Sequence, residues 1–155
     1  MNNQIFPAAF ATFICASGIA IAQSSDTPFV AESQDATGQF TTATEIKAIL
    51  PYTKAQWIAV RPYEGQDLLY FTNLLAWRCG MHQIRFGVNG GDKQVLAMEP
   101  CYLDEAAPNA LKIDGDILPY VTFPIESIET IELELLYDDL SKESAEYERA
   151  AVQIN

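Results

Sequence analysis

A cysteine and the only histidine of the chain lie three residues apart, in the segment Cys79-Gly80-Met81-His82. Thiolates and imidazole nitrogens are common zinc ligands, and Cys101 would supply a third protein ligand. Haem attachment would need a second cysteine before the histidine, and the sequence has none at that position. These residue types therefore allow either a metal site or a disulfide between Cys79 and Cys101.

The N-terminus favours the disulfide. Residues 5–22 are apolar without any charged side chain, and they end in Ala-Ile-Ala, a pattern typical of signal-peptide cleavage sites. We therefore predict that residues 1–22 are a cleaved secretory signal peptide, that the mature protein is periplasmic or secreted, and that it has no membrane span. An uncleaved anchor is the alternative, although about 18 apolar residues are marginal for a span. Cleavage would remove Cys15 and leave Cys79 and Cys101. In an oxidising compartment these two cysteines are expected to form a disulfide, so we predict no metal site and no cofactor.

His82 could instead serve as a general base. The chain has no second histidine and no G-x-S-x-G nucleophile motif, so a hydrolase would have to combine His82 with a carboxylate. The histidine shares the parity of Ile84, Phe86 and Val88, which places it on one face of a predicted strand. We interpret it as a structural or hydrogen-bonded histidine and predict no catalytic residue, with a small periplasmic hydrolase as the alternative.

Three arginines lie among aromatic residues in the middle of the chain. The arginines are Arg61, Arg78 and Arg85, and the aromatic residues are Trp57, Tyr63, Tyr70, Trp77 and Phe86. Guanidinium groups bind anions and stack on aromatic rings, so a shared patch could hold an anion, or a sugar stacked on the rings. The candidate binding residues are Arg61, Trp77, Arg78, His82 and Arg85. The alternative is that the rings form core and the arginine stems pack along a sheet.

Acidic residues outnumber basic residues by 21 to nine, which gives a formal net charge of −12. Residues 104–155 hold 13 acids and three bases, whereas residues 23–103 hold eight acids and six bases. Contacts with phosphate need Lys and Arg, so this charge excludes bulk binding to nucleic acid and disfavours anionic membrane surfaces.

The C-terminal stretch predicts an acidic β-hairpin. Apolar residues from Ile131 to Tyr137 alternate with glutamates, and a second alternating run follows after Asp138-Asp139-Leu140-Ser141. The apolar residues of both strands lie on one face only if they lie opposite each other, which requires the numbers of each opposing pair to sum to an even number. A loop of 139–141 or of 138–142 meets this condition. A helix over 142–152 is the alternative.

That register would place Leu133 opposite Tyr147 and residue 131 opposite residue 149. It would also place Glu134 opposite Glu146, and Glu132 opposite Glu148. Like charges directly opposite each other destabilise a sheet, so this acidic patch could be a docking face or a weak divalent-cation site. We favour a solvated acidic surface that keeps the protein soluble.

The remaining pattern predicts a mainly β protein. A capping box at Thr42–Glu45 predicts one short N-terminal helix over 43–50, ended by Pro51. Predicted strands cover 56–62, 68–79, 84–88, 94–98 and 118–123, with a helix as the alternative for 68–79. We predict a flexible leader over 23–41 and a single antiparallel β-sandwich-like domain over 42–155.

Together these features predict a small exported module that acts by binding, without catalytic machinery. Its partner would be an unknown protein or small ligand of the cell envelope. The alternatives are the hydrolase based on His82 and a divalent-cation-binding module based on the acidic hairpin.

Overall fold

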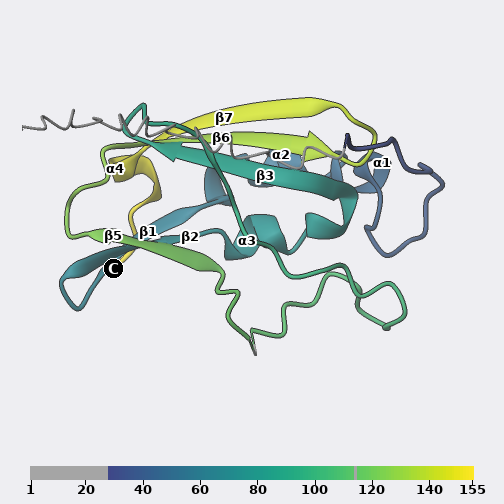
Figure 1. Cartoon of the computed structure of the whole chain (residues 1–155), viewed down its shortest axis with the longest axis horizontal. Helices are drawn as coiled ribbons and strands as arrows, with labels where there is room; N and C mark the ends of the chain where they lie inside the picture. Colours follow the sequence, from purple (N-terminus) through teal and green to yellow (C-terminus); the bar gives the residue numbers. More distant parts are fainter. Residues whose placement is uncertain (1–27, 114) are drawn as a thin grey trace, which may run out of the picture.

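The computed structural model describes residues 28–113 and 115–155. The predicted signal peptide and the first part of the predicted leader, residues 23–27, lie outside the described residues. The chain is mainly β, with two antiparallel sheets of three and four strands in two layers (Figure 1), so the predicted class is confirmed. Among the described residues, no helix is both long enough and apolar enough to cross a membrane.

The smaller sheet has the order β1-β2-β5 and the larger the order β4-β3-β6-β7. The strands of the smaller sheet are β1 (Ala59–Tyr63), β2 (Gln66–Tyr70) and β5 (Tyr120–Pro124). Those of the larger sheet are β3 (Met81–Val88), β4 (Gln94–Val95), β6 (Thr130–Tyr137) and β7 (Lys142–Glu148). β5 is an edge strand, as expected for a strand that is bounded by Pro119 and Pro124.

Short helical turns connect the strands. They are α1 (Ala43–Ile46), α2 (Leu50–Thr53), α3 (Thr72–Leu75) and α4 (Arg149–Val152), with 3₁₀ turns η1 (Lys54–Gln56) and η2 (Arg78–Gly80). The capping box is present, since the Thr42 side chain accepts a hydrogen bond from the Glu45 backbone N–H. The prediction that Pro51 ends one helix at residue 50 was wrong. Pro51 lies in the first turn of α2, where a missing N–H removes no helical bond.

The strand predicted over 68–79 was also too long. β2 ends at Tyr70, and the chain continues through α3 and η2. Phe71, Leu74 and Leu75 are fully or almost fully buried on these turns. A short apolar run that is buried on all sides has no periodicity that separates strand from helix, and here the helical alternative holds for its second half.

The C-terminal hairpin forms, but its register differs from the prediction by two residues. Leu133 pairs with Ala145, and Ile131 pairs with Tyr147. The loop is Asp138–Leu140, because the Tyr137 N–H donates to the Ser141 carbonyl and Leu140 takes a positive φ of 67°. The predicted even parity therefore holds, and the apolar residues share the inner face.

The core lies between the layers. Val60 and Leu69 of the smaller sheet are fully buried, as are Ile131, Leu133 and Leu135 of β6. Phe71 packs against Phe86 of β3 with ring centroids 5.0 Å apart, which joins the layers directly.

One buried ion pair ties the two layers together. Asp67 of β2 is fully buried and receives hydrogen bonds from both Nη atoms of Arg149 in α4, the Nη2 bond being 2.7 Å long. Arg149 also donates to the Ile128 carbonyl, and the backbone beyond α4 then bonds to β1, where the Ile154 N–H donates to the Val60 carbonyl at 2.9 Å. The pair therefore fixes the end of the larger sheet against the smaller one.

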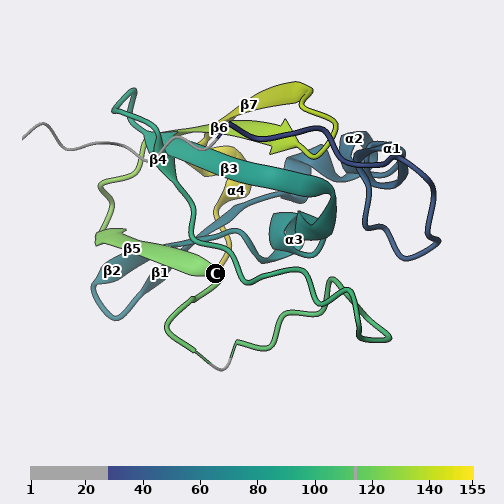
Figure 2. The same cartoon turned by 45° about the vertical axis from the view of Figure 1, so that its right-hand side comes forward.

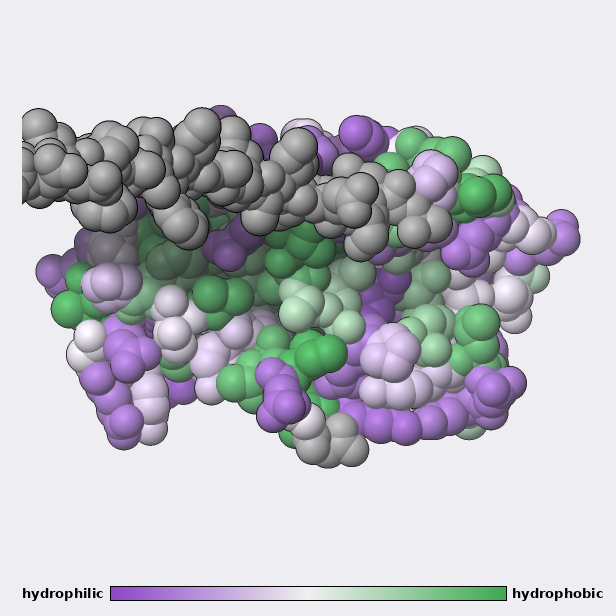
Figure 3. Space-filling view, in the orientation of Figure 1, coloured by the Kyte–Doolittle hydropathy of each residue, from purple (hydrophilic) through white to green (hydrophobic). Residues whose placement is uncertain are grey.

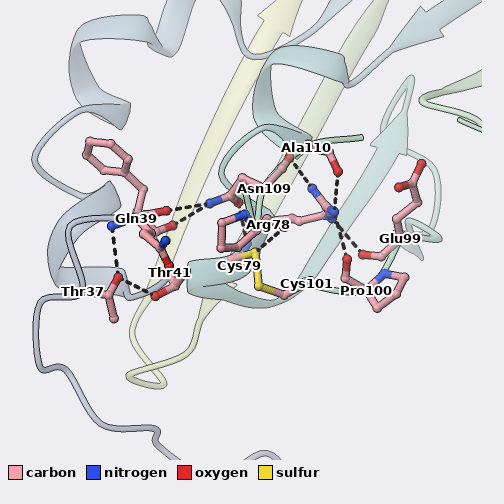
Figure 4. Close-up of a disulfide and its surroundings, with 12 residues drawn as sticks. Thr37, Gln39, Thr41, Arg78, Cys79, Glu99, Pro100, Cys101, Asn109 and Ala110 are labelled. Carbon is pink, nitrogen blue, oxygen red and sulfur yellow. Dashed lines mark hydrogen bonds between the residues drawn. A yellow bond between two sulfur atoms is a disulfide. The ribbon is translucent and has the colours of Figure 1, made fainter. Parts of the chain in front are cut away.

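The predicted disulfide is present. Cys79 follows α3, and Cys101 lies in the long loop after β4, with their Cα atoms 5.1 Å apart. Figure 4 shows the bond beside Asn109, whose side-chain carbonyl accepts from the Cys79 backbone N–H at 3.1 Å. The disulfide thus anchors a loop that has little regular structure of its own.

Replacing Asp67 with Asn should lower the free energy of unfolding at neutral pH by about 3–5 kcal/mol, because Arg149 is then left facing no charge in a buried site. The hydrogen bonds from Arg149 lower the pKa of the Asp67 carboxyl. The contribution of the pair is therefore complete above the ordinary carboxyl pKa and is lost as the pH falls through the lowered folded-state value. Urea unfolding of wild type and D67N should show a large difference at neutral pH and a small one in strong acid.

The control for that comparison is Glu64→Gln on the exposed β1–β2 turn, which should leave the unfolding midpoint unchanged. An equal loss for D67N at both pH values would show that the charge of Asp67 does not stabilise the fold.

Replacing both Cys79 and Cys101 with Ser should destabilise the protein by about 3 kcal/mol, since the bond closes a loop with a sequence separation of 22. Urea unfolding measures the loss. Thiol titration of residues 23–155, unfolded without reductant, should find no free thiol, and two free thiols would contradict the assignment.

Candidate functional site

The outer side of the smaller sheet carries the candidate site. Side chains alternate along a strand, so Val60, Asp67 and Leu69 face the core while their neighbours face outward. The pairing of the strands aligns the outward residues in rows: Ala59 with Tyr70 and Tyr120, Arg61 with Leu68 and Thr122, and Tyr63 with Gln66 and Pro124. Figures 1 and 2 show no helix or strand of the described chain on this side.

These outward residues surround an open hollow of about 520 Å³. We call this surface the tyrosine face, defined by its lining residues Arg61, Tyr63, Glu64, Gln66, Leu68, Tyr70, Tyr120 and Thr122. Leu68 is only 8% exposed although it points outward, so it forms an apolar floor beneath its neighbours. In Figure 3 the β1–β2 turn at the lower left is hydrophilic.

Tyr70 and Tyr120 form an aromatic corner at one end of the hollow. Their ring centroids are 5.1 Å apart, and the ring planes are tilted by 53°. Tyr63 lies four residues further along the strands, which corresponds to roughly 13 Å at the usual rise per residue. A second hollow of about 200 Å³, lined in part by Trp57, Thr72 and Ile154, shares Tyr70, so the concave surface continues past the corner.

The tyrosine hydroxyls on this face have no hydrogen-bond partner within the described chain. Three tyrosines elsewhere donate their hydroxyls to protein oxygens: Tyr102 to Glu99, Tyr137 to Glu143, and Tyr147 to the Lys54 carbonyl. Tyr63, Tyr70 and Tyr120 make no such bond to any described residue. The face therefore offers apolar rings together with free polar groups, which is the combination typical of recognition surfaces.

Arg61 lies at the centre of the face, in the middle row. Its guanidinium carbon is 5.3 Å from the centroid of the Tyr63 ring, a cation–π contact. The structure therefore brings Arg61, Tyr63 and Tyr70 together, as the predicted arginine and aromatic patch requires. It does not bring the other members of that patch to this surface, because Trp57 and Phe86 are buried in the core.

Arg78 is turned inward and holds the backbone instead. It is 3% exposed and donates hydrogen bonds to the carbonyls of Leu75, Glu99, Pro100, Asn109 and Ala110. Figure 4 shows it spanning the two arms of the long loop beside the disulfide. Burial lowers the pKa of its guanidinium, and the nearby Glu99 carboxylate partly offsets this effect.

Trp77 and Arg85 lie elsewhere. Trp77 packs edge-on against Phe40 at 5.4 Å, beside a separate hollow of about 300 Å³ that the 106–110 loop also lines. Arg85 lies on the larger sheet, where it donates to the Lys93 carbonyl at 3.0 Å and approaches Glu134 at 3.9 Å. Neither residue contributes to the tyrosine face.

His82 contacts the segment that precedes α1. Its Nε2 lies 2.9 Å from the Val30 carbonyl, its Nδ1 lies 3.6 Å from Glu32, and its ring stacks on Phe29 at 4.9 Å. Part of the predicted leader therefore packs on the start of β3. The arrangement agrees with the interpretation of His82 as a hydrogen-bonded structural residue.

The acidic patch has a different pairing from the predicted one. Glu132 pairs with Glu146, but Glu134 pairs with Ser144, and Glu148 pairs with Thr130. Lys93 forms an ion pair with Glu132 at 2.8 Å, so the one remaining like-charge pair is compensated within the protein. Among the described residues, no group of three or more His, Cys, Asp or Glu side chains is placed to hold a metal ion.

Comparison with known proteins finds no matching family model, no matching curated protein and no matching solved structure. The function is therefore inferred from the chemistry of the site itself.

Sequence reasoning missed five of the eight residues that line the tyrosine face: Glu64, Gln66, Leu68, Tyr120 and Thr122. The alternation of Tyr120, Val121, Thr122 and Phe123 signals a strand with one polar side. However, the pattern does not reveal that β5 pairs with β2, some fifty residues earlier in the chain. That pairing alone places Tyr120 beside Tyr70.

Replacing Arg78 with Lys keeps the charge but removes donors in a buried site, so it should lower the free energy of unfolding by about 2–4 kcal/mol. Urea unfolding of R78K measures the loss, with the partly exposed Arg85→Lys as a control that should change stability little. A wild-type midpoint for R78K would show that the carbonyl contacts of Arg78 do not stabilise the loop.

Proposed function

We propose that this chain is an exported carbohydrate-binding module and that the tyrosine face is its ligand surface. The observation that carries the proposal is the set of three tyrosines with unbonded hydroxyls around an open hollow, with Arg61 at its centre. No covering element of the described chain lies over this face.

A sugar ring matches this surface chemically. The C–H face of a pyranose is apolar and packs on an aromatic ring, while its hydroxyls need hydrogen-bond partners around the rim. The rings of Tyr70 and Tyr120 supply the first requirement, and the polar groups of Gln66 and Thr122 supply the second. Because the hollow is open along the strands, a polysaccharide chain longer than the hollow could enter and leave at its ends.

Binding is favoured over hydrolysis by the carboxylates that the face contains. Glycoside hydrolysis usually needs two carboxyl groups on opposite sides of the bond that is cleaved. Glu64 is the single carboxylate among the residues that line the hollow. Asp67 is adjacent in sequence to Gln66, but it points to the core and is held there by Arg149.

Export is supported by two features of the chain. The apolar N-terminal segment ends in a signal-peptidase pattern. The Cys79–Cys101 disulfide is the pairing expected of a protein that matures in an oxidising compartment. Within this proposal, the ligand is a polysaccharide of the envelope or of the surroundings of the cell.

Replacing both Tyr70 and Tyr120 with Ala should weaken binding to the polysaccharide at least tenfold, because each stacked ring contributes about 1 kcal/mol beyond its buried area. The measurement is retention of the mature protein in affinity gels cast with a panel of neutral and acidic polysaccharides, followed by calorimetry on the best ligand.

The matched control is Tyr52→Ala, which removes a tyrosine that is 89% exposed and does not line the hollow. It should bind as wild type does. Failure of every polysaccharide to retard the wild-type protein, or equal retardation of the double variant, would overturn the proposed function.

A further inference from the structure

We infer that the tyrosine face selects an acidic glycan, with Arg61 binding the carboxylate of a uronic acid while the tyrosines stack on the sugar rings. The inference rests on the proposed function and adds the charge of the ligand to it. Two independent features lead to it: how the basic residues of the chain are used, and the N–H donors of Arg61 that stay unused beside Tyr63.

The basic residues of this acidic chain are almost all occupied. All nine lie within the described residues, and six form ion pairs with carboxylates: Lys47 with Asp139, Lys54 with Glu143, Arg85 with Glu134, Lys93 with Glu132, Lys112 with Glu105, and Arg149 with Asp67. A seventh, Arg78, is buried among backbone carbonyls. Within the described chain, only Arg61 and Lys142 have neither an ion pair nor a hydrogen bond.

Arg61 is the one of these two that lines a hollow. Lys142 is exposed at the start of β7, on the outer side of the other sheet. Arg61 is partly buried, and its cross-strand neighbours Leu68 and Thr122 carry no charge. The chain has 21 acidic residues, yet no described carboxylate forms an ion pair with Arg61, and this includes Glu64 in the same hollow. A cation that is left without a partner in a hollow is suited to receive one from a ligand.

The contact with Tyr63 leaves the hydrogen-bonding edge of the guanidinium available. The attraction between a guanidinium and a ring is electrostatic and uses no hydrogen bond, so it leaves the five N–H donors in the plane of the group for other acceptors. Arg61 lies over the Tyr63 ring and makes no hydrogen bond within the described chain. The planar fork matches a carboxylate in a bidentate pair, a match that a lysine ammonium does not provide.

The charge around the tyrosine face is less unfavourable to an acidic ligand than the charge on the larger sheet. The acidic strands β6 and β7 belong to the larger sheet, whereas the lining of the tyrosine face holds one cation and one acid, Arg61 and Glu64. Beyond about 10 Å at moderate ionic strength, the charges of the other sheet are largely screened. A polyanion is therefore repelled from most of the molecule and admitted where the arginine lies, which favours selectivity over non-specific adhesion.

The test compares acidic glycans with neutral forms of the same chains. The probes are oligogalacturonate and its full methyl ester, alginate oligosaccharide and its propylene glycol ester, and hexaglutamate as an acidic peptide. Calorimetry is carried out on the mature protein as wild type, Arg61→Gln, Arg61→Lys and Lys142→Gln. Lys142→Gln removes the other unpaired cation and is the matched control, and the Tyr70 and Tyr120 double variant reports on stacking.

The expected result is that at least one acid binds wild type ten times or more tightly than its ester does. R61Q should abolish that ratio by weakening acid binding far more than ester binding, R61K should restore it only in part, and K142Q should match wild type. The acid-to-ester ratio should also fall as salt is raised, because the additional contact is ionic.

Three outcomes would overturn the inference, and they are distinguishable from failure of the proposed function. Equal binding of acid and ester, with both dependent on Tyr70 and Tyr120, would keep the sugar-binding face and reject the carboxylate. Arg61-dependent binding of hexaglutamate as tight as that of the sugars would indicate a peptide ligand. If no acidic glycan binds while a neutral one is retarded in the affinity gels, Arg61 does not select charge.

Discussion

The buried pair between Asp67 and Arg149 connects the parts of the structure on which the candidate site depends. Asp67 lies between Gln66 and Leu68, both of which face the hollow. Because side chains alternate along a strand, holding the Asp67 side chain in the core directs the side chains of Gln66 and Leu68 outward. Arg149 begins α4, and the segment that follows α4 hydrogen-bonds to β1. One ion pair thus determines which side of the smaller sheet is covered and how the sheet is held against the larger one.

The two outer surfaces that result are chemically different. The larger sheet presents charged residues in local pairs, such as Lys93 with Glu132. In the loop of its hairpin, the side chains of Lys47 and Ser141 donate hydrogen bonds to Asp139. Partial burial acts to raise the pKa of Asp139, but the bonds from Lys47 and Ser141 outweigh it and lower the pKa to about 2. Several charges of this surface are therefore paired within the protein, although Lys142 has no ion pair in the described chain. The smaller sheet presents tyrosines and an arginine whose polar groups form no hydrogen bond or ion pair with the described side chains or backbone.

The hydrogen-bond partners of the arginines also distinguish a structural arginine, Arg78, from a candidate binding arginine, Arg61. A buried guanidinium is stable only when its donors are satisfied, and Arg78 meets this condition with carbonyls from the loop that the disulfide also anchors. Arg61 is exposed enough to remain solvated, so it can stay unpaired until a ligand replaces the water. Two residues of the same type thus have opposite roles, and the difference is set by burial.

The sequence by itself determined the local features of this protein: the mainly β class, the pairing of Cys79 with Cys101, the alternation of β3 and β6, and the inner face of the C-terminal hairpin. These follow from patterns that are periodic along the chain or, for the cysteines, from the predicted loss of Cys15 with the signal peptide. The hairpin register was missed because the alternation of apolar residues leaves several registers open, each differing from the next by two residues. The hydrogen bonds of the Asp138–Leu140 loop select one of these registers. The apolar run from Phe71 to Leu75 was ambiguous because burial on all sides leaves no periodicity that separates strand from helix.

Only the tertiary structure decided that Tyr120 joins Tyr70, that Arg78 turns inward and that Arg61 does not. Pairing between distant strands and the depth of burial depend on contacts that no local pattern encodes.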